Sequence, residues 1–79
     1  MKEYKIRIYK REVETNENNN IVINYNLKQV LSGFKTLNFA LSYCAMLSGP
    51  VYELQVVETL DNGYKTAARV HGNGSVETF

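Results

Sequence analysis

Residues 35–50, KTLNFALSYCAMLSGP, decide the fold because they carry the clearest helix signal in the chain and end on a defined stop. Apolar and small residues recur there at the three- and four-residue spacing of one helical face. Gly49 accepts the left-handed conformation that ends many helices, and Pro50 cannot continue one. The sequence therefore predicts a helix over residues 35–48, with a buried stripe formed by Leu37, Ala40, Leu41, Cys44 and Leu47.

The segment before this helix indicates a β-hairpin. Residues 4–9 alternate apolar and charged side chains, which is the period-two pattern of a half-buried strand. Residues 14–20 contain no apolar residue and are predicted to form a long, mobile loop, after which residues 21–25 resume β character. In the first strand, Tyr4, Ile6 and Ile8 share the buried face, while Lys5, Arg7 and Tyr9 point outward.

Residues 26–34 are ambiguous. Asn26 followed by Gln29 could cap a short helix that carries Leu27, Val30 and Leu31. Equally, the second strand could run on through Leu27. The sequence does not decide between the two.

The segment after the helix predicts a second hairpin, in which residues 51–60 and 64–71 flank the turn signal Asp61-Asn62-Gly63. A two-residue Asn-Gly loop would place Leu54 and Val56 on the same face as charged residues. A three-residue loop instead pairs Leu60 with Tyr64, Val56 with Ala68 and Leu54 with Val70. Only this register gathers the apolar residues, so it predicts that five side chains face the helix: Leu54, Val56, Leu60, Ala68 and Val70.

These elements define an α+β fold, a small two-layer sandwich with one helix on a mostly antiparallel sheet, in the order β-β-α-β-β. Gly72-Asn73-Gly74 reads as a turn, and residues 75–79 could add a short fifth strand. With 79 residues, no internal repeat and no linker, the chain is expected to form a single domain over residues 1–79.

Composition argues against most enzymes. The chain has one cysteine and one histidine, and Cys44 falls inside the apolar stripe, where a thiol is usually a core residue. Neither a catalytic set nor a metal or cofactor site can be assembled, so no catalytic, metal or cofactor residue is predicted. No apolar run is long enough to span a membrane, and the charged start is unlike a signal peptide. A cytoplasmic protein without a membrane partner is expected.

Five basic or aromatic residues near the start form a candidate nucleic-acid site, although the net charge of the chain is only +1. Basic groups with an interleaved aromatic can hold phosphates and stack a base. Glu12, Glu14 and Glu17 weaken the field, and a charged strand face also protects a sheet edge from aggregation. The candidate residues are Lys5, Arg7, Tyr9, Lys10 and Arg11.

The predicted helix also carries a second apolar stripe, Phe39, Tyr43 and Met46, beside the first. One sheet face buries only one stripe. Either Leu27, Val30 and Leu31 fold back and cover the second, or its side chains are exposed and bind a partner. Aromatic residues and methionine are enriched at the centres of protein interfaces, so these three residues are the predicted partner-binding site.

The chain is small, is rich in Asn, Lys and Tyr, and has a helix, a helix stop and a hairpin in succession over residues 35–70. In these features it resembles the small α+β proteins that phages and other mobile elements encode to block host machinery, anti-CRISPR proteins among them. The resemblance implies a non-enzymatic inhibitor that covers a surface of its protein partner, and a homodimer is one form such a module could take. It transfers no functional residues. A weak nucleic-acid-binding protein is the alternative.

Overall fold

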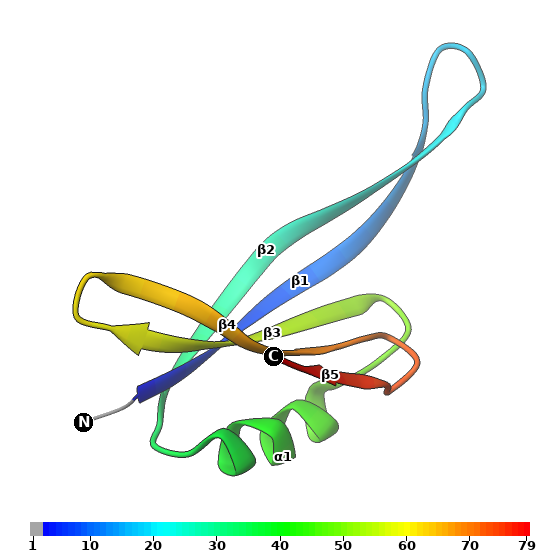
Figure 1. Ribbon diagram of the computed structural model, residues 1–79. Helices are drawn as coiled ribbons and strands as arrows, with labels where there is room; N and C mark the ends of the chain where they lie inside the picture. Colours follow the sequence, from blue (N-terminus) through cyan, green and yellow to red (C-terminus); the bar gives the residue numbers. More distant parts are fainter. Residues whose placement is uncertain (1–2) are drawn as a thin grey trace.

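A computed structural model, which describes residues 3–79, shows one helix packed on one face of a five-stranded antiparallel sheet (Figure 1). The sequence prediction of a small α+β fold is confirmed, including the short fifth strand. The strands lie in the order β2-β1-β3-β4-β5, so the first strand of the chain is the second strand of the sheet. The elements are β1 (Glu3–Thr15), β2 (Ile21–Phe34), α1 (Leu37–Leu47), β3 (Tyr52–Leu60), β4 (Gly63–Val70) and β5 (Val76–Thr78).

The helix α1 buries the stripe that the sequence predicts, but it runs from Leu37 to Leu47 and is shorter at both ends than the predicted span of residues 35–48. Thr36 is the N-cap, and its Oγ1 accepts a hydrogen bond of 3.1 Å from the backbone N–H of Phe39, which satisfies one of the free amides of the first turn. Ala40 and Cys44 are fully buried against the sheet. The three leucines of the stripe are partly buried and pack on the same core: Leu37, Leu41 and Leu47.

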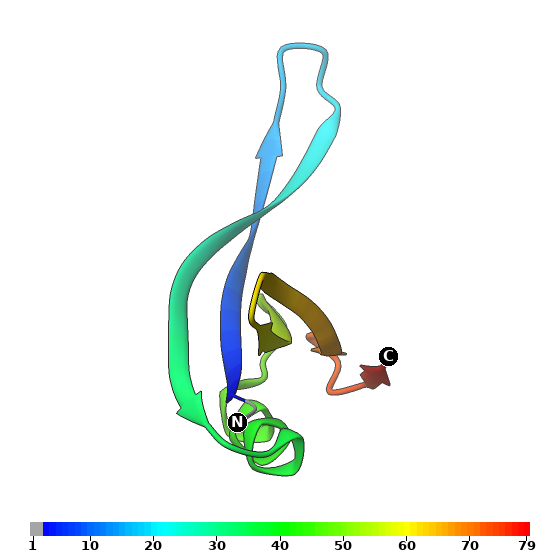
Figure 2. The ribbon, with the colours of Figure 1, turned by 60° about the vertical axis from the view of Figure 1, so that its left-hand side comes forward.

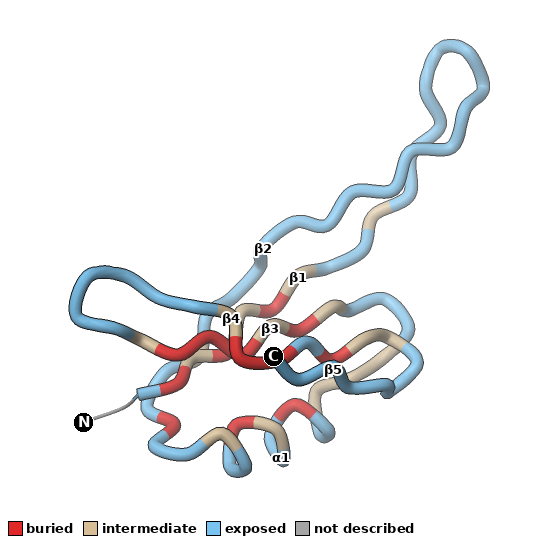
Figure 3. The backbone as a smooth tube through the Cα atoms, viewed as in Figure 1, coloured by how far each residue is buried: buried red, intermediate tan, exposed pale blue. Residues whose placement is uncertain are grey.

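The core lies between α1 and one face of the sheet, which we call the inner face (Figure 3). Ile6, Leu54 and Val56 are fully buried there, because alternate residues of β1 and β3 point toward the helix. The prediction that Tyr4 and Ile8 share this face is confirmed, since each is 9% exposed. Within residues 3–79, no helix or further strand packs on the opposite, outer face of the sheet (Figure 2).

The β3–β4 hairpin has the predicted core register but reaches it by a different turn. Leu54 pairs with Val70 and Val56 with Ala68, and all four side chains are buried. Leu60, however, pairs with Gly63 rather than with Tyr64, and it is 40% exposed, so its predicted place in the core is wrong. The loop has two residues, and a β-bulge at Ala67 restores the register that a three-residue loop would have given.

Residues 26–34 belong to β2, which excludes the short-helix interpretation of this segment. A register shift between Ile8 and Tyr9 leaves Lys28 as an extra residue of β2. Because side chains alternate along a strand, this bulge turns Leu31 toward the core while Leu27 stays on the outer face. A second shift lies close to Gly33, whose φ of +94° suits glycine, and it brings Phe34 into the core.

The distal part of the β1–β2 hairpin, residues 11–26, extends beyond the rest of the sheet, and we call it the arm (Figures 1 and 2). It stands alone because β3 pairs with β1 only from Glu3 to Lys10. The arm is a two-stranded ribbon, and one of its faces exposes apolar side chains: Val13, Ile21, Ile23 and Tyr25.

The turn at the tip of the arm is shorter than the predicted loop of residues 14–20, because Glu14 and Thr15 pair with Val22 and Ile21. Strand pairing uses backbone groups, so polar side chains at a hairpin end do not prevent it. Asn16 closes the turn: its Oδ1 accepts hydrogen bonds of 3.0 Å from the backbone N–H groups of Asn18 and Asn20.

Candidate interaction surfaces

The second stripe of α1 forms an exposed apolar surface, which we call the helix patch. Its members are Phe39, Tyr43 and Met46, which are 61%, 38% and 81% exposed. The buried ring of Phe34 lies beneath two of them, with ring centroids 5.6 Å from Phe39 and 5.4 Å from Tyr43. The ring of Phe34 therefore packs against the two aromatic side chains of the patch and limits their motion.

No other segment within residues 3–79 covers the helix patch. Leu27 and Val30, which the alternative interpretation folded back over it, lie on the outer face of the sheet and are 44% and 47% exposed. The helix itself, LNFALSYCAML, contains no charged side chain. A solvent-facing helix that lacks charge and exposes Phe and Met has the composition of an interface centre rather than of an ordinary surface.

The basic residues of β1 divide between the two faces of the sheet. Lys5, Arg7, Tyr9 and Arg11 alternate on the outer face, as the sequence predicts. Lys10 pairs with Tyr52 and points to the inner side, where it lines a hollow with Leu47 of the helix. The five predicted nucleic-acid residues are therefore not one surface, and only four of them share a face.

The outer face adds three residues that sequence reasoning missed: Tyr64, Arg69 and Phe79. The Arg7 guanidinium carbon lies 5.6 Å from the ring centroid of Tyr9 and 5.4 Å from that of Tyr64. Arg7 Nη1 also donates a hydrogen bond of 3.1 Å to Tyr64 Oη. Arg69 lies 5.7 Å from the ring centroid of Phe79. The predicted β3–β4 register already placed Arg69 opposite Gln55, but nothing in the sequence showed that β1 pairs with β3.

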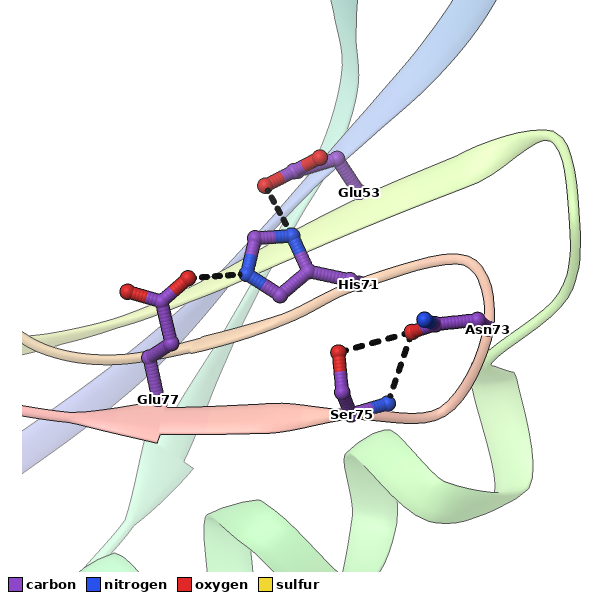
Figure 4. A network of polar contacts seen from close by, with 5 residues as sticks. All are labelled: Glu53, His71, Asn73, Ser75 and Glu77. Carbon is purple, nitrogen blue, oxygen red and sulfur yellow. Dashed lines mark hydrogen bonds and ion pairs between the residues drawn. The ribbon is translucent and has the colours of Figure 1, made fainter.

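A polar cluster at one end of the outer face ties three strands together (Figure 4). His71 follows β4, and its Nδ1 lies 3.1 Å from an oxygen of Glu53 in β3, while its Nε2 lies 2.5 Å from an oxygen of Glu77 in β5. Asn73 Oδ1 accepts hydrogen bonds from the backbone N–H and the hydroxyl of Ser75, which closes the turn before β5. The cluster fastens the three-residue strand β5 to the sheet.

Cys44 and His71 do not form a nucleophile and base pair, because Cys44 lies in the core on the inner face and His71 lies on the outer face. Burial raises the pKa of the Cys44 thiol to about 11, so the thiolate is scarce at neutral pH. Among residues 3–79, no group of three histidine, cysteine or acidic side chains is arranged to hold a metal ion. In the same residues, no helix combines the length and the apolar character needed to cross a membrane.

Comparisons with protein-family models, with curated proteins and with solved structures find no match for this chain.

Proposed function

We propose that the protein is a non-enzymatic binding module that uses the helix patch to cover a surface of a protein partner. One observation carries the proposal: α1 exposes Phe39 and Met46 at 61% and 81%, and no charged residue of the helix surrounds them. Apolar side chains grouped in this way are unfavourable in water and become favourable when a partner removes them from it.

The free energy available from burying the helix patch is enough for a specific protein contact of modest size. Apolar burial contributes about 25 cal/mol per Å², so three large side chains and their surroundings supply several kcal/mol before the entropy of association is subtracted. The rings of Phe39 and Tyr43 already rest on Phe34, which reduces the entropy lost when a partner binds. The partner surface is expected to be apolar at its centre, because a charged centre would be desolvated without compensation.

Occlusion is the mode of action that fits a domain of this size. Within residues 3–79, Cys44 and His71 lie on opposite faces of the sheet and form no nucleophile–base pair, so the proposed effect on a partner is to block a site by contact. The proposal agrees with the resemblance to small phage-encoded inhibitors. We propose a cytoplasmic contact, because a chain with a single free cysteine forms no internal disulfide. The partner is either another protein or a second copy of the chain.

The test compares Met46→Asp with Ser42→Asp, which adds the same charge to the polar side of the same helix. Sedimentation velocity measures self-association, and capture from a cognate lysate measures binding to another protein. We expect Met46→Asp to abolish whichever association the unaltered protein shows and Ser42→Asp to retain it, with unchanged circular dichroism for both. If both variants associate like the parent, or if the parent neither self-associates nor captures a protein, the proposal is wrong.

A further inference from the structure

We propose that the outer face of the sheet is a second binding site, for a short segment of single-stranded nucleic acid. The site is formed by Arg7 and Tyr9 of β1, Tyr64 and Arg69 of β4, and Phe79, and we call these five residues the stacking platform. These residues lie on the outer face of the sheet, whereas α1, which carries the helix patch, packs on the inner face (Figure 2), so the platform is separate from the proposed protein contact.

The arginines of the platform lie close to aromatic rings, and within residues 3–79 they form no ion pair with a carboxylate. Arg7 lies between Tyr9 and Tyr64, and Arg69 lies against Phe79. Within residues 3–79, neither guanidinium forms an ion pair with an acidic side chain, whereas Lys28 and Lys65 each have a glutamate partner. A guanidinium beside a ring has several N–H donors, so those that the protein does not use can bind a phosphate.

The aromatic side chains offer surfaces on which bases can stack. Tyr64 and Phe79 are 60% and 70% exposed, and they lie on the uncovered face of the sheet. Every base has a π-face, so such rings bind a single strand with little sequence preference. In a duplex the bases stack on each other, and flat rings on a sheet cannot reach their faces.

A polar side chain lies between the two arginines and can contact a base edge. Arg7 pairs with Gln55 of β3, and Gln55 pairs with Arg69, so the three residues form a row across three strands. Gln55 and Arg69 also line a shallow hollow of about 320 Å³ with Tyr9, Tyr25 and Glu53. An amide there can donate to a base and accept from it, which a purely electrostatic surface cannot do.

The charges around the platform limit the length of strand that it can hold. Glu53 lies opposite Tyr9 in the β1–β3 pair and Glu77 lies opposite Arg69 in the β4–β5 pair, and both carboxylates contact His71. These carboxylates repel a phosphate backbone that continues toward His71, and beyond Arg11 the same face of the arm exposes apolar rather than basic side chains. The occupant is therefore a short single strand that makes about three phosphate contacts, through Lys5, Arg7 and Arg69.

The experiment measures fluorescence anisotropy of labelled oligouridylate and oligothymidylate at low salt. With about three contacts on a single strand, log affinity falls with log salt at a slope near −2. We expect Tyr64→Ala to weaken binding about fivefold to a hundredfold, which is the effect of losing one stacked base. Arg69→Gln is compared with Lys65→Gln, which removes the same charge from the same strand but on the inner side.

Arg69→Gln should weaken binding clearly more than Lys65→Gln, and Phe39→Asp in the helix patch should leave it unchanged. The proposal is overturned if the unaltered protein binds no oligonucleotide at low salt, or if the two charge variants weaken binding equally. It is also overturned if duplex binds as tightly as single strand, or if inorganic polyphosphate, which has no bases, competes as well as the oligonucleotide per phosphate. Circular dichroism checks that each variant is folded.

Discussion

The two halves of the β1–β2 hairpin have similar backbone pairing and very different surroundings. In the half near the helix, β1 lies between β2 and β3, and Ile6 and Ile8 are 0% and 9% exposed. In the arm the same two strands continue alone, and Val13 and Ile23 are 57% and 47% exposed. Backbone pairing therefore forms the strands in both halves, but their side chains are buried only in the half that also packs against a third strand and a helix.

Hydrogen exchange gives the largest expected contrast between these halves. Amides of β1 over residues 4–9 should exchange only when the domain unfolds, about a thousandfold or more slower than in an unfolded chain. An isolated two-stranded ribbon is marginally stable, so amides of the arm should exchange within about tenfold of the unfolded rate. NMR exchange measurements resolve the two sets. Equal protection in both halves would mean that the arm is supported by a contact outside the chain.

Truncation of side chains sharpens the same comparison. Leu54→Ala removes a fully buried side chain and should lower the free energy of unfolding by about 2–5 kcal/mol. Ile23→Ala removes a half-exposed side chain of the arm, and we expect a change of about 0.5 kcal/mol or less. Urea denaturation measures both. A loss for Ile23→Ala as large as that for Leu54→Ala would contradict the separation of arm and core.

The reactivity of cysteine thiols tests whether the core excludes solvent while the arm is open to it. Cys44 is fully buried, and its raised pKa of about 11 leaves about a hundredfold less thiolate than an ordinary cysteine has. Iodoacetamide should therefore modify Cys44 at least a hundredfold more slowly in the folded protein than in urea. The variant Val22→Cys places a second thiol in the arm, where Val22 is 37% exposed. The new thiol should react rapidly while Cys44 does not, as followed by mass spectrometry. Equal rates for both would disprove the buried position of Cys44.

The ion pair between Glu12 and Lys28 is expected to have the smallest effect. Their side-chain atoms lie 3.1 Å apart, and Lys28 lowers the pKa of Glu12 below its ordinary value of 4.5. A lowered pKa means that the pair stabilises the fold above the ordinary pKa and that this contribution is lost as pH falls through the lowered one. Both side chains are exposed, so salt should screen most of it. In an NMR titration, Lys28→Gln should return the Glu12 pKa toward its ordinary value; an unchanged pKa would show that the pair does not form.

Much of the core could be predicted from the sequence, because it depends on local patterns. The stripe from Leu37 to Leu47 has an unbroken helical period, and the alternation from Tyr4 to Ile8 has an unbroken strand period. The β-bulges could not be predicted from the sequence. Apolar residues at 27, 30, 31 and 34 have the spacing of a helix, yet they belong to a strand whose extra residues at two bulges alter its alternation. The Ala67 bulge similarly compensated for a turn one residue shorter than predicted.

Of the two candidate sites, the one formed by a local pattern could be predicted from the sequence and the one formed by distant strands could not. Phe39, Tyr43 and Met46 lie on one helix, so helical geometry alone grouped them, and the structure shows that no described segment covers them. The stacking platform joins strands far apart in the sequence, so it depends on the pairing of β1 with β3. From one sequence the segments around Arg7 and Arg69 are not seen to be neighbours, because no local pattern specifies which strands pair.

The central place of β1 has a consequence for how the chain folds as it leaves the ribosome. The β1–β2 hairpin can close as soon as residues 3–34 have emerged, because its contacts are local. The other side of β1 then waits for β3, whose partners are about fifty residues away, and Ile6 and Ile8 stay uncovered until then. During that interval the nascent hairpin exposes an apolar face and an open edge to other chains. The speed of translation through residues 35–60 should therefore influence how much of the protein aggregates before its core is complete.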